Sequence, residues 1–338
     1  MHKVSLPKVS VIVALRNEAQ NVESLMNSLK NQTYPDRLLQ FIFVDDHSDD
    51  QTKQLLQKAA ETLKGLRVMS LPDEKRGKKQ ALKAAIEIAE GELYVFTDAD
   101  CHLGPNWIGS MVKGYFKANG GMVLAPVKIS PVRSPFSLFQ AFEFSSLMLS
   151  AVGSAYFKLP MLGNGANLAY SSKYRQLALA AMDSPTCSGD DMFVLQSFVK
   201  SRIPVIFLKD SDAMVETMAH ESLWLLLQQR FRWAHKNKYF GFNASNFFGA
   251  VVYFSNAAVL AGLMLALFFP AFVWYSLVLF FLKTGFDLIL TGAGSGFFGL
   301  KKYLWAVPLF EIPLMAFYTV SGLAVFFPAF TWKGRACK

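Results

Sequence analysis

Short apolar runs alternate with amphipathic stretches along the first half of the chain. Residues 9–15 (VSVIVAL) and 40–44 (QFIFV) are continuous runs of branched and aromatic residues, the pattern of strands buried on both faces of a parallel sheet. Between them, apolar residues recur at helical spacing from 22 to 29. This spacing predicts a helix over about residues 19–31, with Asn17 as its N-cap.

The alternation of strands and helices continues along the chain. Further strands are predicted at 66–70, 93–97 and 121–127, with a short strand LAY at 168–170. Further helices are predicted at about 51–64, 78–90 and 221–234. Strands that alternate with helices indicate an α/β fold with a doubly wound, mostly parallel sheet, and ligands of such sheets bind beyond the carboxyl ends of the strands.

Residues 135–158 are rich in Phe, Leu and Met and carry almost no charge. They are predicted to form one long helix. Three positions are compatible with its composition: over the active site, at a membrane interface, or in the core.

The composition changes abruptly in the last third of the chain. Acidic residues are almost absent beyond residue 245, and residues 247–269 are apolar without a charge. At about 1.5 Å per residue, this segment is long enough to cross a hydrocarbon core of roughly 30 Å. We therefore expect a catalytic domain over residues 1–240 and a membrane region over residues 241–338.

Two further apolar segments of the membrane region contain charges. Residues 271–290 include Lys283 and Asp287, and residues 303–328 include Glu311. Because charges at membrane depth are costly and usually face protein or the interface, these two segments are weaker candidates for spans than the first.

The formal net charge is +9, but the basic residues are scattered. No basic run interleaves with aromatic residues as a nucleic-acid face would require, so nucleic acid is not an expected partner. Residues 230–238 (RFRWAHKNK) instead lie just before the first apolar segment, where anionic head groups attract Lys and Arg. A membrane surface is therefore the expected partner, and a solvated charged helix is the alternative.

The three cysteines, Cys101, Cys187 and Cys337, are an odd number without metal-type spacing. We expect reduced thiols, which fits a catalytic domain on the cytoplasmic side of the inner or plasma membrane. The first ten residues, MHKVSLPKVS, lack the apolar core of a signal peptide, so nothing there is expected to direct export of the catalytic domain.

The sequence TDAD at 97–100 directly follows an apolar strand. Asp98 and Asp100, at i and i+2 of an extended turn, can converge on one hard divalent cation, Mn²⁺ or Mg²⁺, which in turn neutralises a diphosphate. Two aspartates in a turn are often only turn formers, but their position after a buried strand favours a metal site.

Two further polar clusters follow predicted strands. In VDDHSDD at 44–50, Asp45 and Asp46 can accept hydrogen bonds from a base or a ribose, while Ser48 or Asp49 is expected to cap the following helix. In RGKKQAL at 76–82, Lys78 beside a glycine at the start of a helix favours phosphate oxygens.

Asp190 and Asp191, in SGDDMF, are adjacent carboxylates at a predicted transition from loop to helix. Mutual repulsion and partial burial would raise the pKa of one of them, as a general base for a hydroxyl requires. The alternative is that the pair caps the helix.

The sequence QRFRW at 229–233 places Gln229, Arg232 and Trp233 on one helical face. An amide, a guanidinium and an indole can together bind a diphosphate and stack against a sugar. Arg230 is expected to face solvent or lipid head groups, as is Lys236.

The order of these motifs resembles that of the family 2 inverting glycosyltransferases, a group that includes cellulose, chitin and hyaluronan synthases and ceramide glucosyltransferase. The resemblance covers about residues 7–240 and rests on these segments: VSVIVALRNEAQNV, VDDHSDD, GKKQAL, TDADC, GANLAY, GDD and QRFRW. It implies a GT-A nucleotide-diphospho-sugar transferase fold. It also implies a nucleotide-sugar donor and a lipid or saccharide acceptor.

The resemblance assigns roles to individual residues. The N-terminal motif brings Asn17 and Glu18 into the donor site, Asp45 and Asp46 lie near the base, and Lys78 lies near the diphosphate. Asp98 and Asp100 hold the metal, Asp191 is the catalytic base, and Gln229, Arg232 and Trp233 bind the donor diphosphate and the acceptor end. Many family members have Gly at the position of His47 and Glu at that of Asp190, and the second difference leaves open which aspartate is the base.

These roles imply direct displacement with inversion at the anomeric carbon, in which Asp191 removes the proton of an acceptor hydroxyl. Transfer of one sugar, from a UDP-sugar to a lipid or lipid-linked acceptor, is the expected reaction. The alternatives are a processive polysaccharide synthase, which QRFRW also fits, and a non-catalytic nucleotide-binding membrane scaffold.

Overall fold

The computed structural model describes residues 5–183, 189–236, 239, 244–323, 330–332 and 335–337. The described chain divides into two compact units, Met1–Lys128 with Ala151–Met218 and Ile129–Ser150 with Ala219–Lys338. Three predictions fall partly outside the described residues: those on Cys187, on residues 237–238 of the basic segment, and on residues 324–328 of the third apolar segment.

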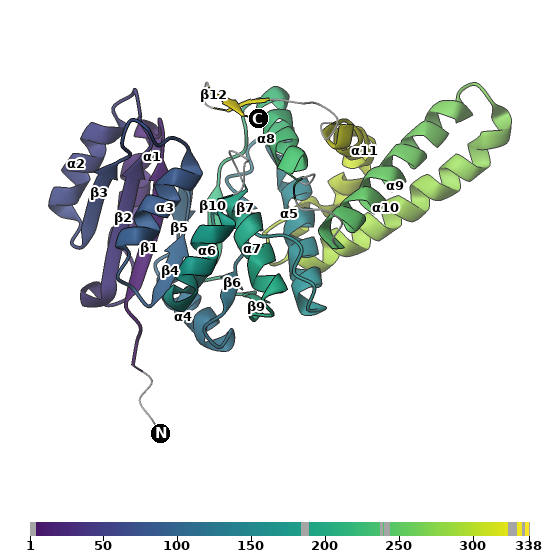
Figure 1. The fold of residues 1–338 in the computed structure, drawn as a ribbon. Helices are drawn as coiled ribbons and strands as arrows, with labels where there is room; N and C mark the ends of the chain where they lie inside the picture. Colours follow the sequence, from purple (N-terminus) through teal and green to yellow (C-terminus); the bar gives the residue numbers. More distant parts are fainter. Residues whose placement is uncertain are drawn as a thin grey trace. The chain divides into compact units, whose positions relative to one another are not determined.

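The first unit is built on a seven-stranded sheet in the order β3-β2-β1-β4-β8-β6-β9 (Figure 1). Its strands are β1 (Val9–Leu15), β2 (Leu39–Asp45), β3 (Leu66–Ser70), β4 (Leu93–Phe96), β6 (Met122–Leu124), β8 (Leu168–Ser171) and β9 (Val205–Phe207). Only β8 among them runs antiparallel to its neighbours, β4 and β6. The predicted mostly parallel sheet is confirmed, and the central strands are buried on both faces because helices cover them.

The helices of the first unit follow the predicted alternation. They are α1 (Ala19–Lys30), α2 (Thr52–Thr62), α3 (Lys78–Ile88), α4 (Trp107–Lys117), α6 (Arg175–Ala181) and α7 (Asp190–Lys200). A smaller sheet contains β5 (Cys101–Leu103), β10 (Val215–Thr217) and β7 (Val127–Ile129), in that order.

The single strand predicted at 121–127 is wrong, because the segment forms β6 and then β7 in a different sheet. Pro126 separates the two strands. Proline has no N–H to continue the ladder, and its carbonyl oxygen instead accepts a bond from the N–H of Val215 at 3.0 Å. The chain therefore leaves one sheet and enters the other at this residue.

The predicted helix caps are also wrong. Glu18 and Gln51 occupy the cap positions of α1 and α2, and their own side chains make no capping bond. The carboxylate of Asp50 instead accepts bonds from the first N–H of each helix, that of Ala19 (3.1 Å) and that of Thr52 (2.9 Å). The side chain of Asn17 accepts a bond from the N–H of Asp49 (3.0 Å), and Ser48 Oγ accepts one from the N–H of Asn17 (3.0 Å). These polar side chains join the loops after β1 and β2 instead of capping the helices.

The second unit is mainly helical. It contains α8 (Leu223–Lys236), α9 (Ala244–Ala266), α10 (Val273–Ser295) and α11 (Val307–Leu323), with a hairpin of β11 (Phe330–Trp332) and β12 (Arg335–Cys337). It also contains most of α5 (Pro135–Tyr156), whose last residues from Ala151 belong to the first unit. The long helix predicted over 135–158 is thus present.

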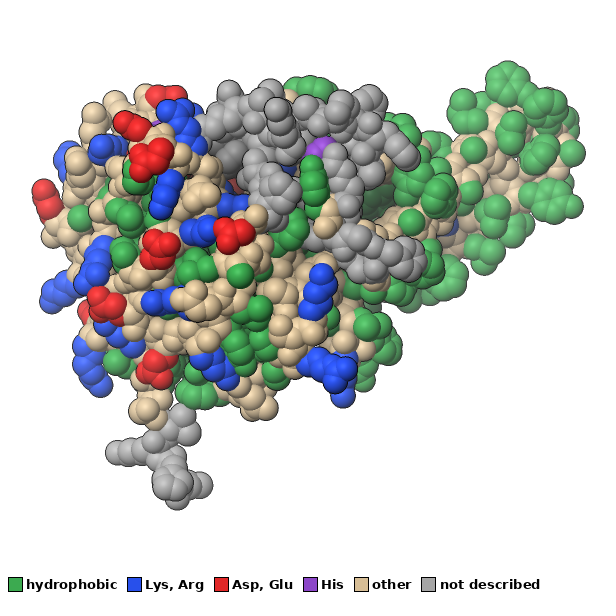
Figure 2. All heavy atoms as spheres, in the orientation of Figure 1, with side chains coloured by type: hydrophobic (Ala, Val, Ile, Leu, Met, Phe, Trp, Pro, Cys, Tyr) green, Lys and Arg blue, Asp and Glu red, His purple; other side chains and the backbone are tan. Residues whose placement is uncertain are grey.

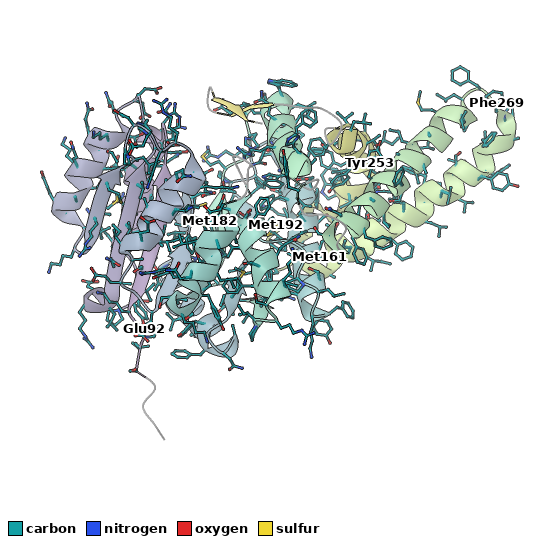
Figure 3. All side chains as sticks on the ribbon, viewed as in Figure 1. Glu92, Met161, Met182, Met192, Tyr253 and Phe269 are labelled. Atoms are coloured by element: carbon teal, nitrogen blue, oxygen red, sulfur yellow. The ribbon has the colours of Figure 1, made fainter. Side chains whose placement is uncertain are left out.

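Within the part of the chain that the structure describes, four helical segments are long and apolar enough to cross a membrane: Pro135–Tyr156, Ala244–Ala266, Pro270–Ser295 and Lys301–Leu323. They differ in how much of their surface the protein covers. The most apolar window of the first is 61% buried, whereas those of the second and third are 11% buried. Figure 2 shows the hydrophobic side chains that cover α9 and α10, and Figure 3 shows Phe269 at the turn between these helices.

The charged residues of the apolar segments pair with one another. Lys283 Nζ on α10 donates to Asp287 Oδ2 at 2.6 Å and also forms an ion pair with Glu311 of α11, which is fully buried. The pairing explains how these segments carry charges despite their composition, since intramembrane charges are tolerated when they face each other inside protein.

Candidate functional site

The polar clusters of the first unit lie at one edge of the sheet. Strands β1, β2 and β4 are parallel neighbours, so the loops after Leu15, Asp45 and Phe96 leave the sheet on the same side. This edge is where a doubly wound sheet binds its ligands. The structure therefore places the predicted motifs of the first unit on the binding edge.

The turn after β4 presents Asp98 and Asp100. Burial, together with the negative charges of Asp98 and Glu18, raises the pKa of Asp100 to about 6. Thr217 Oγ1 donates to Asp100 Oδ2 at 3.3 Å, which orients that carboxylate. Three carboxylates that repel one another at a partly buried turn are a place where a cation would be stabilised.

The chemistry of this turn fits a divalent metal. Carboxylate oxygens are the ligands that Mg²⁺ prefers, and Mg²⁺ is commonly held by one or two carboxylates together with substrate phosphates. Over the described ranges, no group of three or more His, Cys, Asp or Glu side chains is placed to hold a metal ion. Asp98 and Asp100 would therefore share the cation with ligands from a bound diphosphate.

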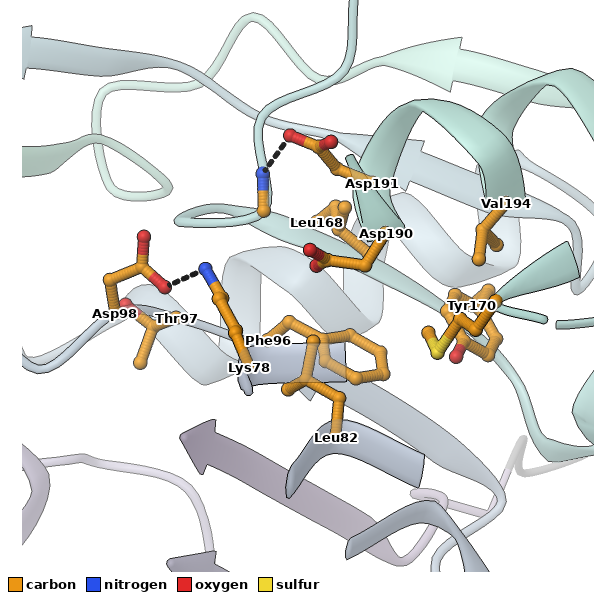
Figure 4. A pocket seen from close by; sticks show the side chains of 12 residues that line it. Lys78, Leu82, Phe96, Thr97, Asp98, Leu168, Tyr170, Asp190, Asp191 and Val194 are labelled. Carbon is orange, nitrogen blue, oxygen red and sulfur yellow. Dashed lines mark hydrogen bonds and ion pairs between the residues drawn. The ribbon is translucent and has the colours of Figure 1, made fainter. Parts of the chain in front are cut away.

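Lys78 opens α3 and reaches the same turn. Its Nζ donates to Asp98 Oδ1 at 2.5 Å (Figure 4). Burial opposes its charged form, but Asp98, Asp190 and Asp191 together raise the pKa of Lys78 above its ordinary value. The ammonium group of Lys78 is therefore charged and lies among carboxylates.

Asp190 and Asp191 occupy the first turn of α7, after Gly189, which is the cap residue with φ +95°. The Asp191 carboxylate accepts bonds from the N–H groups of Gly165 (3.1 Å) and Met192 (2.7 Å). Figure 4 shows the carboxyl group of Asp190 directed toward Lys78, while that of Asp191 points to the loop. The two adjacent acids thus have different surroundings.

One pocket joins these groups. It is lined by Lys78, Leu82, Phe96, Thr97, Asp98, Gly165, Leu168, Tyr170, Met182, Asp190, Asp191 and Val194. A Cβ at Gly165 would lie 3.6 Å from both Lys78 Nζ and Asp190 Oδ2, an ordinary contact distance, so Gly165 lies next to both charged groups. The structure therefore brings together the predicted Lys78, Asp98, Asp190 and Asp191.

The apolar lining residues and the role of Gly165 were missed by the sequence analysis. Gly165 lies in the segment GANLAY, whose glycine is a visible signal of close approach. Met182 and Val194 carry no such signal, because their helical spacing is that of ordinary core residues.

Asp45 and Asp46 are almost fully buried at the end of β2. Asp46 Oδ1 accepts a bond from the N–H of Gly77 at 3.0 Å, and Asp45 Oδ1 accepts one from the N–H of Ser48 at 3.3 Å. Between them and the helix, His47 has φ +53°, a left-handed conformation that favours glycine. Asp46 thus links the loop after β2 to the residue that precedes Lys78.

The remaining predicted residues lie on α8 of the second unit. The expectation that Arg230 faces solvent is wrong, because its side chain is buried and donates from Nε to Glu143 Oε1 at 2.8 Å. Its guanidinium lies 4.2 Å from the ring centroid of Trp233 and hydrogen-bonds the side chain of Gln229. The buried carboxylate of Glu143 needs a counter-charge, and Arg230 supplies it.

Comparison with known proteins finds similarity to glycosyltransferases. Residues 10–163 match the model of "Glycosyl transferase family 2". Glycosyltransferase AglE of Haloferax volcanii is 33% identical over 104 residues, which are 31% of this chain and 34% of that protein. The beta-monoglucosyldiacylglycerol synthase of Trichormus variabilis is 28% identical over 133 residues, 39% of this chain and 28% of that protein. The chain thus spans about a third of these relatives' length.

A solved structure shares the fold over nearly the whole chain. This structure is the mannosyltransferase PcManGT of Pyrobaculum calidifontis, solved in complex with GDP-Man and Mn²⁺. The match covers 96% of this chain and 88% of the mannosyltransferase chain, with 19% sequence identity and a TM-score of 0.58. The likeness confirms the predicted GT-A fold.

Proposed function

We propose that the protein moves a sugar from a nucleotide-diphosphate donor, a UDP-sugar, to a lipid or lipid-linked acceptor at a membrane, because residues 10–163 match the model of "Glycosyl transferase family 2". The observation that carries the proposal is the pocket at the carboxyl end of β4. There, a charged lysine meets three aspartates on the binding edge of the sheet.

In this proposal one aspartate of α7 is the general base. Asp191 takes the proton of an acceptor hydroxyl, and the oxygen attacks the anomeric carbon on the face opposite the diphosphate, so the configuration inverts. The backbone bonds to Asp191 fix the orientation of its carboxylate. Asp190, which faces Lys78 in the same pocket, is the alternative base.

The leaving diphosphate is neutralised by positive charge at the pocket. The ammonium group of Lys78 faces the carboxylates there and can exchange Asp98 for phosphate oxygens. A divalent cation, Mn²⁺ or Mg²⁺, held by Asp98 and Asp100 would stabilise the same negative charge.

The donor is held by further residues in this proposal. Asn17, Glu18, Asp45 and Asp46 belong to the loops after β1 and β2 and bind the nucleotide portion. The closeness of Glu18 to Asp100 supports its place at the donor site. By their motif, the α8 residues Gln229, Arg232 and Trp233 bind the diphosphate and the acceptor end.

The membrane role rests on the apolar helices. We propose that residues 1–240 form a cytoplasmic catalytic domain and residues 241–338 a membrane region, in the inner or plasma membrane. The exposed apolar surfaces of α9 and α10 support insertion, since aqueous proteins rarely expose such large apolar patches. The similarity to the beta-monoglucosyldiacylglycerol synthase of Trichormus variabilis supports a lipid acceptor, because the name of that relative refers to a diacylglycerol lipid.

The proposal is tested with the purified full-length protein in lipid nanodiscs. A panel of nucleotide sugars is supplied with membrane lipids, and release of nucleoside diphosphate is measured together with the mass of the lipid product. We expect one donor to give a product larger by one sugar. Nucleoside diphosphate release without a glycolipid product, or formation of a polymeric product, would contradict transfer of a single sugar to a lipid. If no donor gave nucleoside diphosphate release, the proposed glycosyltransferase activity would be contradicted.

A further inference from the structure

We propose that Gln140 and Glu143 of α5 are positioning residues, which orient the side chains of α8 that hold donor and acceptor. The proposal rests on the function proposed above for Gln229, Arg232 and Trp233. It concerns groups within the second unit, and none of the four residues that build the arrangement, Gln140, Glu143, His220 and Arg230, was assigned a role by the sequence motifs.

The centre of the arrangement is a buried ion pair. Glu143 is fully buried, and Arg230 meets it with two N–H groups, one of them from Nε to Oε1 at 2.8 Å. A two-pronged pair of this kind fixes both the distance and the plane of the guanidinium. The plane of Arg230 is therefore set by α5.

The fixed guanidinium orients its neighbours on α8. It lies 4.2 Å from the ring centroid of Trp233, and its Nη1 donates to Gln229 Oε1. Phe144, the residue after Glu143, lies with its ring centroid 6.4 Å from that of Trp233. Two of the three side chains proposed to hold the substrates thus take their orientation from Arg230 and from α5.

Gln140 makes a second connection, one helical turn before Glu143 on the same face of α5. Its side-chain amide donates to the carbonyl oxygen of His220 (2.9 Å) and accepts from the N–H of His220 (2.8 Å). The ring of His220 is hydrogen-bonded to the side chain of Gln229. Burial lowers the pKa of His220, so the ring is neutral near pH 7 and adds no charge beside Arg230.

The energetics favour a positioning role over a stabilising one. Burying an ion pair costs much of what its attraction gains, and apolar replacements of similar volume are often as stable. The Glu143–Arg230 pair is therefore expected to add little to net stability. Its contribution is to hold the side chains of Gln229 and Trp233, which Arg230 contacts, in a fixed orientation.

The experiment uses Glu143→Gln in the full-length protein in nanodiscs. This variant keeps the size of the side chain and removes its charge. We expect the KM for the nucleotide sugar to rise about tenfold, the size of effect typical of residues coupled in one network, with a smaller change in kcat. The affinity for UDP, titrated by calorimetry, should fall in parallel, so the result does not depend on turnover alone.

Glu311→Gln is the matched control. Glu311 is also fully buried in the second unit and is paired with one lysine of another helix, but it lies in α11. If loss of any buried ion pair produced the effect, this variant would show it too. We expect its KM to stay within about twofold of the unaltered protein, and an equal rise in both variants would overturn the proposal.

Trp233→Ala separates the positioning role from the proposed function. If Glu143 acts through Trp233 and Gln229 of α8, the loss in the double variant Glu143→Gln/Trp233→Ala should be smaller than the sum of the two single losses, and fully additive losses would refute positioning. If Trp233→Ala loses sugar transfer or UDP binding, but Glu143→Gln folds and keeps both, only the positioning inference fails. If Trp233→Ala transfers sugar and binds UDP normally, the role proposed for Trp233 fails and the inference falls with it.

If Glu143→Gln does not fold, the variant Arg230→Lys tests the same proposal. Lysine keeps the charge but lacks the planar fork and the stacking surface, so it should raise the KM in the same way. An unchanged KM in that variant would refute the proposal.

Discussion

Asp190 and Asp191 are neighbours in sequence, yet the start of α7 gives them different partners. The side chains of consecutive helical residues point in directions about 100° apart. Asp191 is therefore tied to the N–H of Gly165, while Asp190 is directed toward Lys78. Both lie near the positive end of a helix, which favours charged carboxylates.

The first prediction distinguishes the two acids. Asp191→Asn should lower kcat by about 10² to 10⁴, because a positioned general base is lost, while UDP binding stays near normal. Arg232→Ala should instead weaken UDP binding, since it removes a charge-assisted contact worth about 1.5 to 3 kcal/mol. Steady-state kinetics and calorimetry measure the two effects.

Asp190→Asn is the control for that assignment. If it is the inactive variant while Asp191→Asn keeps its turnover, Asp190 is the base. If both variants keep their turnover, displacement assisted by either aspartate is wrong.

The second prediction concerns Asp98 and Asp100. Their mutual repulsion with Glu18 is relieved when a cation binds, and the cation also neutralises the diphosphate. EDTA should abolish transfer, and Mn²⁺ or Mg²⁺ should restore it. Nucleoside diphosphate release is the measurement, and full activity in chelator would exclude a required metal.

At the residue scale, the sequence predicted those groups whose position along the chain already carries the signal. Asp98, Asp190 and Lys78 follow strands or open helices, and the parallel sheet brings them together. Arg230 was misjudged because its partner, Glu143, lies 87 residues away, in a segment whose composition looks uniformly apolar. A long-range pair of this kind has no local sequence signal.

At the scale of elements, periodicity predicted most of the strands and helices, whereas local chemistry at their ends was less informative. Asn17 and Ser48 are good capping residues, but the two loops that carry them lie side by side and bond to each other. These side chains therefore form tertiary hydrogen bonds with the neighbouring loop, although the local sequence predicted that they cap helices.

The membrane helices make the same point with charges. Lys283 of α10 lies between Asp287, one turn further along, and Glu311 of α11. In the sequence, each of these charges weakened the prediction that its segment spans the membrane. In the structure, the charges pair and connect α10 with α11. At the contact between α9 and α11, Gly322 lies against the ring of Tyr253, where a Cβ would come within 2.1 Å of Cδ2.

The third prediction follows from that link. Lys283→Met leaves the buried Glu311 without its counter-charge and should destabilise the protein by about 3 to 5 kcal/mol. The double variant Lys283→Met/Glu311→Met removes both charges and should recover most of this loss. Thermal unfolding in detergent gives the comparison, and a double variant as unstable as the single one would contradict the argument.

At the scale of the whole chain, the side of the membrane on which the C-terminus lies depends on how many helices cross. In the second unit, β11 lies against α8, the helix that precedes α9. Phe317 of α11 packs with Leu226 of α8 and Phe139 of α5 in one buried cluster. Helix α11 therefore contacts the helix that comes before the first span, in addition to its contacts with α9 and α10.

This arrangement favours an even number of crossings. The helices α9 and α10 form a hairpin whose turn exposes Leu267, Phe268 and Phe269 and whose surfaces are largely uncovered. They are the segments suited to cross and return. Because β11 contacts α8, we expect the hairpin of β11 and β12 to lie on the same side of the membrane as α8, which the positive-inside rule also favours for the basic sequence TWKGRACK.

The last prediction is that Cys337, in β12, lies on the cytoplasmic side. Cys187 is replaced by serine and Cys101 is buried, so that labelling reports on Cys337. An impermeant maleimide should leave it unlabelled in intact cells and label it after permeabilisation. A cysteine introduced at Phe268, in the turn between α9 and α10, marks the opposite face. Strong labelling of Cys337 in intact cells would mean that α11 crosses as well, and that the contact of β11 with α8 is not kept in the membrane.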